Sequence, residues 1–240
     1  MPFKTETHAH TSVVSPCGKL STRELRDMYL AAGYTTIVTT DHLVDWLPLF
    51  RGVRSWRDRV HRFYSGYREL AAACSGTDLV VLPGFELTYP GLPGRDFLVF
   101  GIDEPTLAQL PNICRLDPAS FRPVAEDAGA LVFQAHPYRG CEPVDPSLID
   151  GIEVFNGNPR HDSRNDLAAA FADRHDLLRI SGSDAHQRED VGCGGIVTPE
   201  PIRTVPDLIR WLRDDPGQIE LIGAERSVTS ITVAIGSARP

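Results

Sequence analysis

The sequence predicts an α/β fold built on parallel strands, and three observations support this prediction. Short apolar runs that favour β-strands alternate with segments of helical period, as in parallel α/β domains. Each clear run ends near a histidine, aspartate or glutamate. The 240 residues, 42% hydrophobic and 23% charged, can bury one large core, and no linker or internal repeat divides them. We therefore expect a single domain over residues 1–240.

The first half of the chain follows from local patterns. A strand leads into His8, and a helix begins at the capping box formed by Ser21 and Glu24. A strand over residues 34–40 comes next. Over residues 54–74 the apolar positions keep a period of 3.6, which predicts one long amphipathic helix.

The second half continues the alternation. A Pro/Gly turn between the apolar runs at residues 79–82 and 96–100 is too short for a crossover helix, so we expect a local hairpin-like irregularity there. The remaining expected elements are strands at residues 130–135, 151–155 and 177–180, helices at residues 163–174 and 206–212, and a closing strand through Val228, Ile231, Val233 and Ile235.

Composition excludes several classes of protein. No segment has the roughly 18 unbroken apolar residues of a membrane span, and the N-terminus lacks a secretory pattern, so we expect a cytoplasmic protein. A net charge of -8, from 24 basic and 32 acidic residues, argues against stable nucleic-acid binding. Five cysteines without a CxxC pair indicate neither a disulfide framework nor a zinc ribbon.

Potential metal ligands gather at the ends of the expected strands. In a parallel barrel these ends converge on one face, so ligands that are far apart in sequence meet there. In His8-Ala9-His10 and Asp184-Ala185-His186, the two-residue period of a strand points both outer side chains the same way. Either pair alone is more often accidental, but together the strand-end residues predict a metal centre. The candidate ligands are His8, His10, His42, Glu86, Asp96, His136, Asp184 and His186.

The chain resembles the PHP (polymerase and histidinol phosphatase) superfamily over about residues 5–200. The resemblance rests on five motifs in order: Thr7-His8-Ala9-His10-Thr11, Thr40-Asp41-His42, Gly84-Phe85-Glu86, His136-Pro137 and Ser183-Asp184-Ala185-His186. It implies a distorted seven-stranded (β/α)7 barrel with two or three divalent ions (Mn, Fe or Zn), used mostly for phosphate ester hydrolysis.

The resemblance also implies how the ligands divide among the metals. The first metal would be held by His8, His10, Glu86 and Asp184. Glu86 would bridge to a second metal that His136 also binds. His42 and His186 would belong to a third.

Two positions depart from the family pattern. Asp96 stands where the family usually has a histidine; a carboxylate still binds a borderline cation and favours manganese or iron over zinc. Ser15-Pro16-Cys17 stands where the family has an aspartate or histidine. Cys17 either completes the third site as a thiolate or is an ordinary loop cysteine, so two metals are a firmer expectation than three.

The expected activity is hydrolysis of a small phosphorylated metabolite or nucleotide, a mono- or diester, by a hydroxide held between two or three metal ions. Glu86 and Asp184 are candidates to steer the proton. His186 or His42 is a candidate general acid for the leaving oxygen.

Arginines at the expected face would distinguish a phosphate enzyme from other hydrolases, because a guanidinium fork matches phosphate oxygens. The predicted substrate contacts are Arg139, Arg160 and Arg188. Lys4 and Lys19 are the only lysines, so in this arginine-rich chain some arginines would fall there by chance. Two other functions stay open: a metal-dependent hydrolase of carbon–nitrogen or carboxylic ester bonds, and a non-catalytic metal-binding module.

Overall fold

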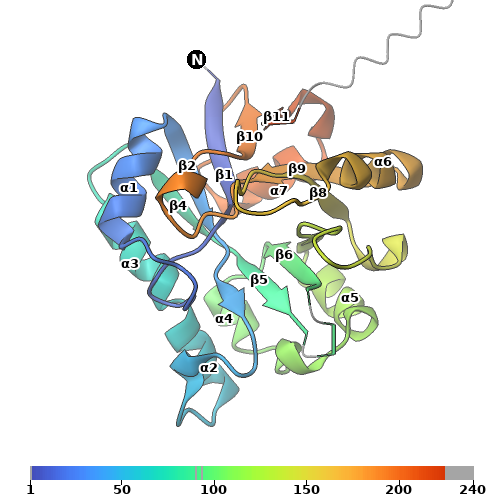
Figure 1. Ribbon diagram of the computed structural model, residues 1–240. Helices are drawn as coiled ribbons and strands as arrows, with labels where there is room; N and C mark the ends of the chain where they lie inside the picture. The colour runs from blue at the N-terminus through green and yellow to red at the C-terminus, as the bar shows by residue number, and fades with distance from the viewer. Residues whose placement is uncertain (1, 90, 93, 225–240) are drawn as a thin grey trace, which may run out of the picture.

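Two curved sheets form the centre of the molecule, and helices cover them from outside (Figure 1). The computed structural model describes residues 2–89, 91–92 and 94–224. Its strands are β1 Phe3–Ala9, β2 Tyr34–Thr39, β3 His42–Leu43, β4 Val80–Pro83, β5 Phe85–Thr88, β6 Asp96–Phe100, β7 Leu131–Gln134, β8 Gly151–Asn156, β9 Leu178–Gly182, β10 Gly195–Thr198 and β11 Glu220–Ile222. Its α-helices are α1 Thr22–Ala31, α2 Trp56–Phe63, α3 Ser65–Cys74, α4 Glu104–Leu107, α5 Pro118–Asp127, α6 Asn165–His175 and α7 Val205–Arg213.

The strand order explains how distant segments meet. One sheet runs β11-β10-β1-β2-β4 and the other β3-β5-β6-β7-β8-β9. Five of the nine neighbouring pairs are parallel, while β6 is antiparallel to both β5 and β7, and β10 is antiparallel to both β1 and β11. A parallel bridge between Ala9 and Ala185 joins the end of β1 to the segment after β9. The predicted class, a distorted α/β barrel, is confirmed. A hairpin does precede residue 100, but β5 and not the run at residues 79–82 pairs with β6; that run forms β4, which pairs with β2 in the other sheet.

Helix α1 follows the sequence closely. Ser21 and Glu24 form the predicted capping box, and the buried Leu25 and Tyr29 face the first sheet. In Figure 1, α1 and α3 lie together outside β2 and β4, whereas α6 lies beyond β8. The helices therefore cover the sides of the barrel.

The prediction of one helix over residues 54–74 is wrong. The segment divides into α2 and α3 at Tyr64, whose ψ of 2° departs from helical geometry. The Tyr64 hydroxyl donates to the Ile102 carbonyl at 2.8 Å. A Cβ at Gly66 would lie 2.4 Å from Asp41 Oδ2, so α3 starts in close contact with the loop after β2. Packing at these two points breaks the helix, and the apolar periodicity of the sequence does not reveal such contacts.

Several elements were not expected from the sequence. They are α4, α5, β3, β10 and β11, all of them short or, in α5, interrupted by Pro123. The closing strand expected near residue 231 lies outside the described residues, and the single-domain expectation stays a prediction. Within the described part of the chain, no helix has the length and apolar character needed to cross a membrane.

Candidate metal centre

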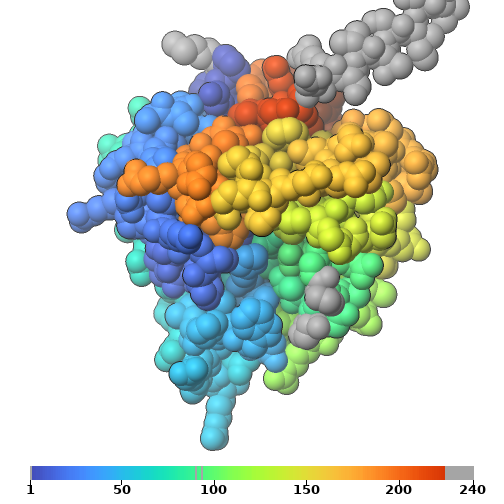
Figure 2. All heavy atoms as spheres, in the orientation of Figure 1, coloured from blue at the N-terminus to red at the C-terminus, as the bar shows by residue number. Residues whose placement is uncertain are grey.

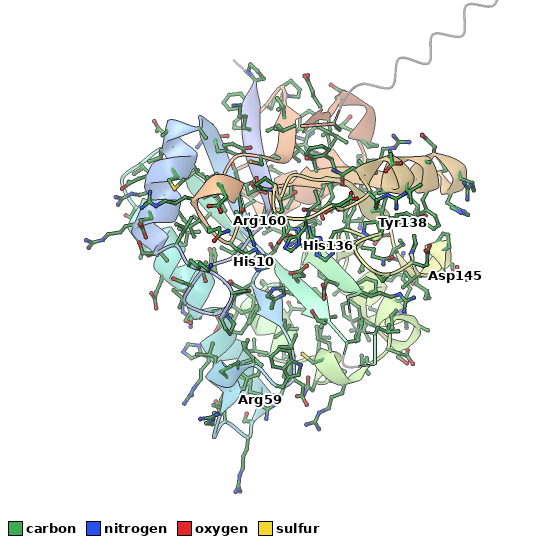
Figure 3. All side chains as sticks on the ribbon, viewed as in Figure 1. His10, Arg59, His136, Tyr138, Asp145 and Arg160 are labelled. Atoms are coloured by element: carbon green, nitrogen blue, oxygen red, sulfur yellow. The ribbon has the colours of Figure 1, made fainter. Side chains whose placement is uncertain are left out.

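The carboxyl end of β1, the start of β5 and the segment after β9 bring four predicted ligands together in the interior. His8 Nε2 lies 3.4 Å from Glu86 Oε1 and 3.5 Å from Asp184 Oδ1. His10 Nε2 lies 3.4 Å from Glu86 Oε2 and 3.4 Å from the same Asp184 oxygen. All four residues are buried. Figure 3 labels His10 near the middle of the view, beside His136 and far from Arg59.

These residues fit a divalent cation. Ligand atoms about 2.1 Å from a common tetrahedral cation are about 3.4 Å apart, which matches the spacing of the four side chains. Among the described residues, His8 Nε2, His10 Nε2 and Glu86 Oε2 are buried without a hydrogen-bond partner. Glu86 Oε2 lies 2.8 Å from His42 Nδ1, which supplies a charged partner. Because an unpaired buried polar atom is costly, the two imidazole nitrogens need a ligand that the hydrogen bonds of the protein do not supply.

A second group of possible ligand atoms shares Glu86. It contains His8, Glu86 and His136, and His136 Nε2 lies 3.2 Å from Glu86 Oε1. Asp96 Oδ2 lies 3.9 Å from His136 Nε2, and its other oxygen accepts a 2.5 Å hydrogen bond from Thr88. The geometry allows Glu86 to bridge two cations, as its two oxygens face different histidines.

A third group lies on the solvent side of His10. It contains His10, His42 and His186. The rings of His42 and His186 stack on the ring of His10, with centroid distances of 4.5 Å and 4.2 Å. Partial burial of the Cys17 thiol is outweighed by hydrogen bonds with His186 and His42, which lower the pKa of Cys17 to about 6. Cys17 belongs to an exposed loop. The Cys17 thiol therefore lies beside two imidazoles.

The buried charges stabilise one another. Burial opposes ionisation of Glu86, but His42 and His8 hold its pKa well below the usual range. The pKa of Asp184 is lowered too, because His8 and His10 outweigh its burial. Burial disfavours a charged His8, yet the carboxylates around it, Glu153 first, raise its pKa. The carboxylates and His8 thus favour one another's charged forms.

Two of the predicted ligands have strained backbones. His136 has a φ of 28° and Asp184 a φ of 50°, in the left-handed region that residues with a Cβ seldom adopt. Such conformations cost about 1–3 kcal/mol and persist where the surroundings impose them. His136 follows β7 and Asp184 follows β9, and the turn at each residue directs its side chain into the cluster, Asp184 toward His8 and His136 toward Glu86.

Glu153, on β8, is a site residue that the sequence reasoning missed. Its Oε1 lies 2.9 Å from His8 Nδ1, while Oε2 accepts hydrogen bonds from the His136 backbone and the Asn156 amide, both at 2.9 Å. The carboxylate is fully buried. It fixes the ring of His8 so that Nε2 faces the cluster. The signal in the sequence was an acidic residue inside an apolar strand.

The sequence reasoning also missed Glu6, which is an acidic residue within strand β1. Its Oε1 accepts from the backbone N–H groups of Thr7, His8 and Ser183 at 3.0, 2.9 and 2.9 Å, and Oε2 accepts from the Tyr29 hydroxyl at 2.9 Å. Burial raises the pKa of Glu6 despite these hydrogen bonds. The residue ties the end of β1 to the segment that presents Asp184.

The three predicted substrate arginines lie in different surroundings. Arg139 donates to Asp184 Oδ2 at 2.7 Å and to Asn156 Oδ1 at 2.6 Å. Arg160 forms a two-pronged pair with Asp190, at 3.0 and 2.8 Å. Arg188 pairs with Glu24 on α1 and does not join the cluster. Their contact with substrate stays a prediction.

The loops around the cluster meet on one face of the molecule. Figure 2 shows the dark blue loop after β1, the orange segment after β9, the gold loop after β8 and the green β5–β6 region bordering one another there. Two other histidines lie apart from the cluster: His61 pairs with Glu104 at 2.7 Å, and the His175 ring lies 4.4 Å from that of Phe171.

Comparisons with known proteins agree with this geometry. Residues 162–215 match the family model described as PHP-associated. No curated protein matches the sequence. PsfC from Pseudomonas syringae PB-5123 is similar with a TM-score of 0.61 and 17% identity, over 87% of this chain and 88% of PsfC. An amidohydrolase from Chromobacterium violaceum, with bound sulfate and no metal, has a TM-score of 0.55 and 18% identity, over 92% and 98% of the chains.

Endonuclease Q is a further structural neighbour. Its complex with a 27-mer duplex carrying an abasic lesion has a TM-score of 0.58 and 12% identity, over 89% of this chain and 57% of the endonuclease. The lesion-specific endonuclease Q of Pyrococcus furiosus has a TM-score of 0.60 and 15% identity, over 92% and 58%. At such identities the likeness concerns the fold.

Proposed function

Since the chain carries a PHP superfamily domain, we propose that it is a metal-dependent phosphoesterase acting on a small phosphorylated metabolite or nucleotide. The observation that supports this most directly is the convergence of His8, His10, Glu86 and Asp184 on one point, with unpaired buried atoms facing it. The guanidinium of Arg139 is held on Asp184, at the edge of this cluster. A fixed cation beside a metal centre suits an anionic phosphate ester better than a neutral amide.

Different residues of the chain are proposed for metal binding and for proton transfer. Divalent manganese, iron or zinc ions at these ligands would lower the pKa of a bound water and polarise a phosphoryl oxygen. Glu86 and Asp184 would hold the ions, and a carboxylate oxygen of either residue would steer the proton. His186, partly exposed at the rim, is placed to protonate the leaving oxygen.

The neighbours bear on the class of substrate. The Chromobacterium violaceum amidohydrolase holds sulfate, a tetrahedral anion like phosphate, and endonuclease Q takes duplex DNA. A net charge of -8 opposes the binding of a long phosphate backbone, which favours a small ester for this chain. Hydrolysis of a carbon–nitrogen or carboxylic ester bond is the competing function.

The test is phosphate release by protein loaded separately with manganese, iron or zinc, across a panel of phosphate mono- and diesters. We expect turnover and competitive inhibition by inorganic phosphate. Arg139→Ala should weaken that inhibition at least about tenfold, because a hydrogen bond to a charged group is lost. Arg139→Lys, which keeps the charge, separates this effect from disturbance of Asp184.

Arg115→Ala is the matched control, because Arg115 is exposed and pairs with Asp45 away from the cluster. Its inhibition by phosphate should equal that of the unmodified protein. Turnover confined to amides or carboxylic esters would establish the competing function. Full metal occupancy without turnover on any panel would instead indicate a metal-binding module.

A further inference from the structure

The guanidinium of Arg139 is held by three acceptors of the protein. Nη1 donates to Asp184 Oδ2 at 2.7 Å, and Nη2 donates to Asn156 Oδ1 at 2.6 Å. Ser163 Oγ accepts from Nη2 at 3.0 Å and from Nε at 3.3 Å. Of the five N–H groups of a guanidinium, bonds within the described part of the chain therefore engage four. The fifth is on Nη1, and Arg139 can offer it to a substrate oxygen beside Asp184, because its side chain is 22% exposed.

Asn156, at the end of β8, provides the shortest of these bonds. The residue is buried, and its Nδ2 donates to Glu153 Oε2 at 2.9 Å. A guanidinium only donates hydrogen bonds, and Glu153 Oε2 accepts here, also from the His136 backbone. The amide of Asn156 therefore has a single orientation, with Nδ2 toward Glu153 and Oδ1 toward Arg139.

The backbone of Asn156 is fixed by a different neighbour. Its N–H donates to Asn165 Oδ1 at 3.0 Å, and its carbonyl oxygen accepts from Asn165 Nδ2 at 3.1 Å. Asn165 thus holds the strand end, whereas the side chain of Asn156 holds Arg139. These two effects can be separated by substitution.

We propose that Asn156 is a positioning residue that fixes the guanidinium of Arg139 for the phosphate group of the substrate. The proposal rests on the proposed phosphoesterase function, in which Arg139 contacts the anion. Without Asn156 Oδ1, the guanidinium loses its shortest hydrogen bond and gains rotational freedom about its C–N bonds. A group that is fixed before the ligand arrives loses less entropy on binding, so freeing Arg139 weakens the binding of phosphate.

Nuclear magnetic resonance of the arginine side chains tests the positioning without substrate. In ¹⁵N-labelled, metal-free protein, a held guanidinium gives two separate Nη signals, whereas a rotating one gives a single averaged signal. Arg139 should show two signals, identified by their loss in Arg139→Lys. Asn156→Ala should merge them. Asn156→Asp, which keeps an oxygen facing Arg139, should retain both.

Two further variants separate this effect from a general disturbance. Asn165→Ala is the matched control and should retain both signals, because it removes only bonds to the backbone of Asn156. Asn156→Leu has nearly the volume of asparagine but no acceptor, so it should merge the signals without leaving a cavity. The backbone amide spectrum shows whether each variant is folded, and Asn156→Leu decides the matter if Asn156→Ala is not.

Titration of inorganic phosphate into metal-loaded protein measures the consequence for binding. Asn156→Ala should raise the Kd of phosphate about three- to tenfold, and Asn165→Ala should leave it unchanged. Adding Asn156→Ala to Arg139→Ala should weaken binding no further, because the positioned side chain is already absent.

The outcomes distinguish the two proposals. Separate Arg139 signals in folded Asn156→Ala or Asn156→Leu, merged signals in Asn165→Ala, or additive losses in the double variant overturn the role of Asn156. If the signals merge in Asn156→Ala but the unmodified protein binds no phosphate, the hold on Arg139 is established and the phosphoesterase function is rejected.

Discussion

Glu153 influences two of the candidate metal sites through hydrogen bonds alone. It holds His8 through Nδ1 and His136 through the backbone N–H, and both bonds are 2.9 Å long. A carboxylate behind a metal-binding histidine fixes the tautomer and makes the ring a better donor. Because His8 belongs to both the first and the second groups of ligands, Glu153 should affect both cations.

Glu153→Gln is therefore expected to weaken metal binding without unfolding the protein. The amide keeps the length of the side chain but removes the negative charge behind His8, and outer carboxylates of this kind are worth about 10- to 100-fold in metal affinity. Calorimetric titration of Zn²⁺ or Mn²⁺ into metal-free protein measures the change. Glu126→Gln, on the exposed face of α5, is the control and should bind as the unmodified protein does. Equal affinities in all three proteins would refute the role of Glu153.

At the scale of residues, the sequence predicts which side chains meet better than it predicts their supports. The convergence of His8, His10 and Asp184 follows from the rule that the ends of parallel strands meet, which needs no coordinates. Glu6 and Glu153 lie within strands. A buried acidic residue in a strand indicates that its charge has a partner, but the sequence does not show which residue that partner is. Glu6 bonds with Ser183, 177 positions away in sequence, and Glu153 bonds with His8, 145 positions away.

The turn after β9 is stabilised by the buried carboxylate of Asp190. Asp190 is completely buried, and its Oδ2 accepts from the backbone N–H groups of His186 and Gln187, both at 2.9 Å, and from Arg160 at 2.8 Å. Burial alone would raise the pKa of Asp190, but Arg160 and the two backbone bonds lower it. The turn that presents His186 thus depends on one ionised carboxylate.

Asp190→Asn should lower the free energy of unfolding by about 1–3 kcal/mol near neutral pH, since buried donors lose a charged acceptor. Because the pKa of Asp190 is lowered in the folded state, this stabilisation is complete above the unfolded pKa of about 3.9 and disappears as the pH falls through the folded value. Urea unfolding of both proteins across that range measures the difference. Asp166→Asn, on exposed α6, should change stability by less than about 0.5 kcal/mol at every pH. A difference between Asp190→Asn and the unmodified protein that does not shrink in acid would contradict this account.

At the scale of elements, periodicity finds helices but not where tertiary contacts interrupt them. The capping box of α1 is local, and it was predicted correctly. The break between α2 and α3 depends on Tyr64 reaching Ile102 and on Gly66 meeting Asp41, contacts between segments about 25 to 38 positions apart. No window of 18 residues contains that information.

Across the whole molecule, closure of the barrel concentrates acidic charge where it is least solvated. Glu86 and Asp184 are buried side by side with His8 and His10, although the chain already has a net charge of -8. Bound cations would neutralise this region, so the active face would be less negative than the total suggests. The sequence predicts this convergence but not the registers that close the barrel, such as the irregular pairing of β1 with β2.

Metal binding should consequently stabilise the entire fold, because the cluster joins the ends of β1, β5 and β9. A cation present at about 100 times its Kd adds about 2.7 kcal/mol to the free energy of unfolding, which for a chain of this size raises the Tm by about 5–10 °C. Differential scanning calorimetry with and without metal measures the shift, and a chelator should reverse it. His8→Ala removes a ligand common to two groups and should lose most of the shift relative to its own metal-free Tm. His61→Ala removes a surface histidine and should keep the full shift. If His8→Ala gained as much stability from metal as His61→Ala, the cations would be binding elsewhere and the strands would not be joined through them.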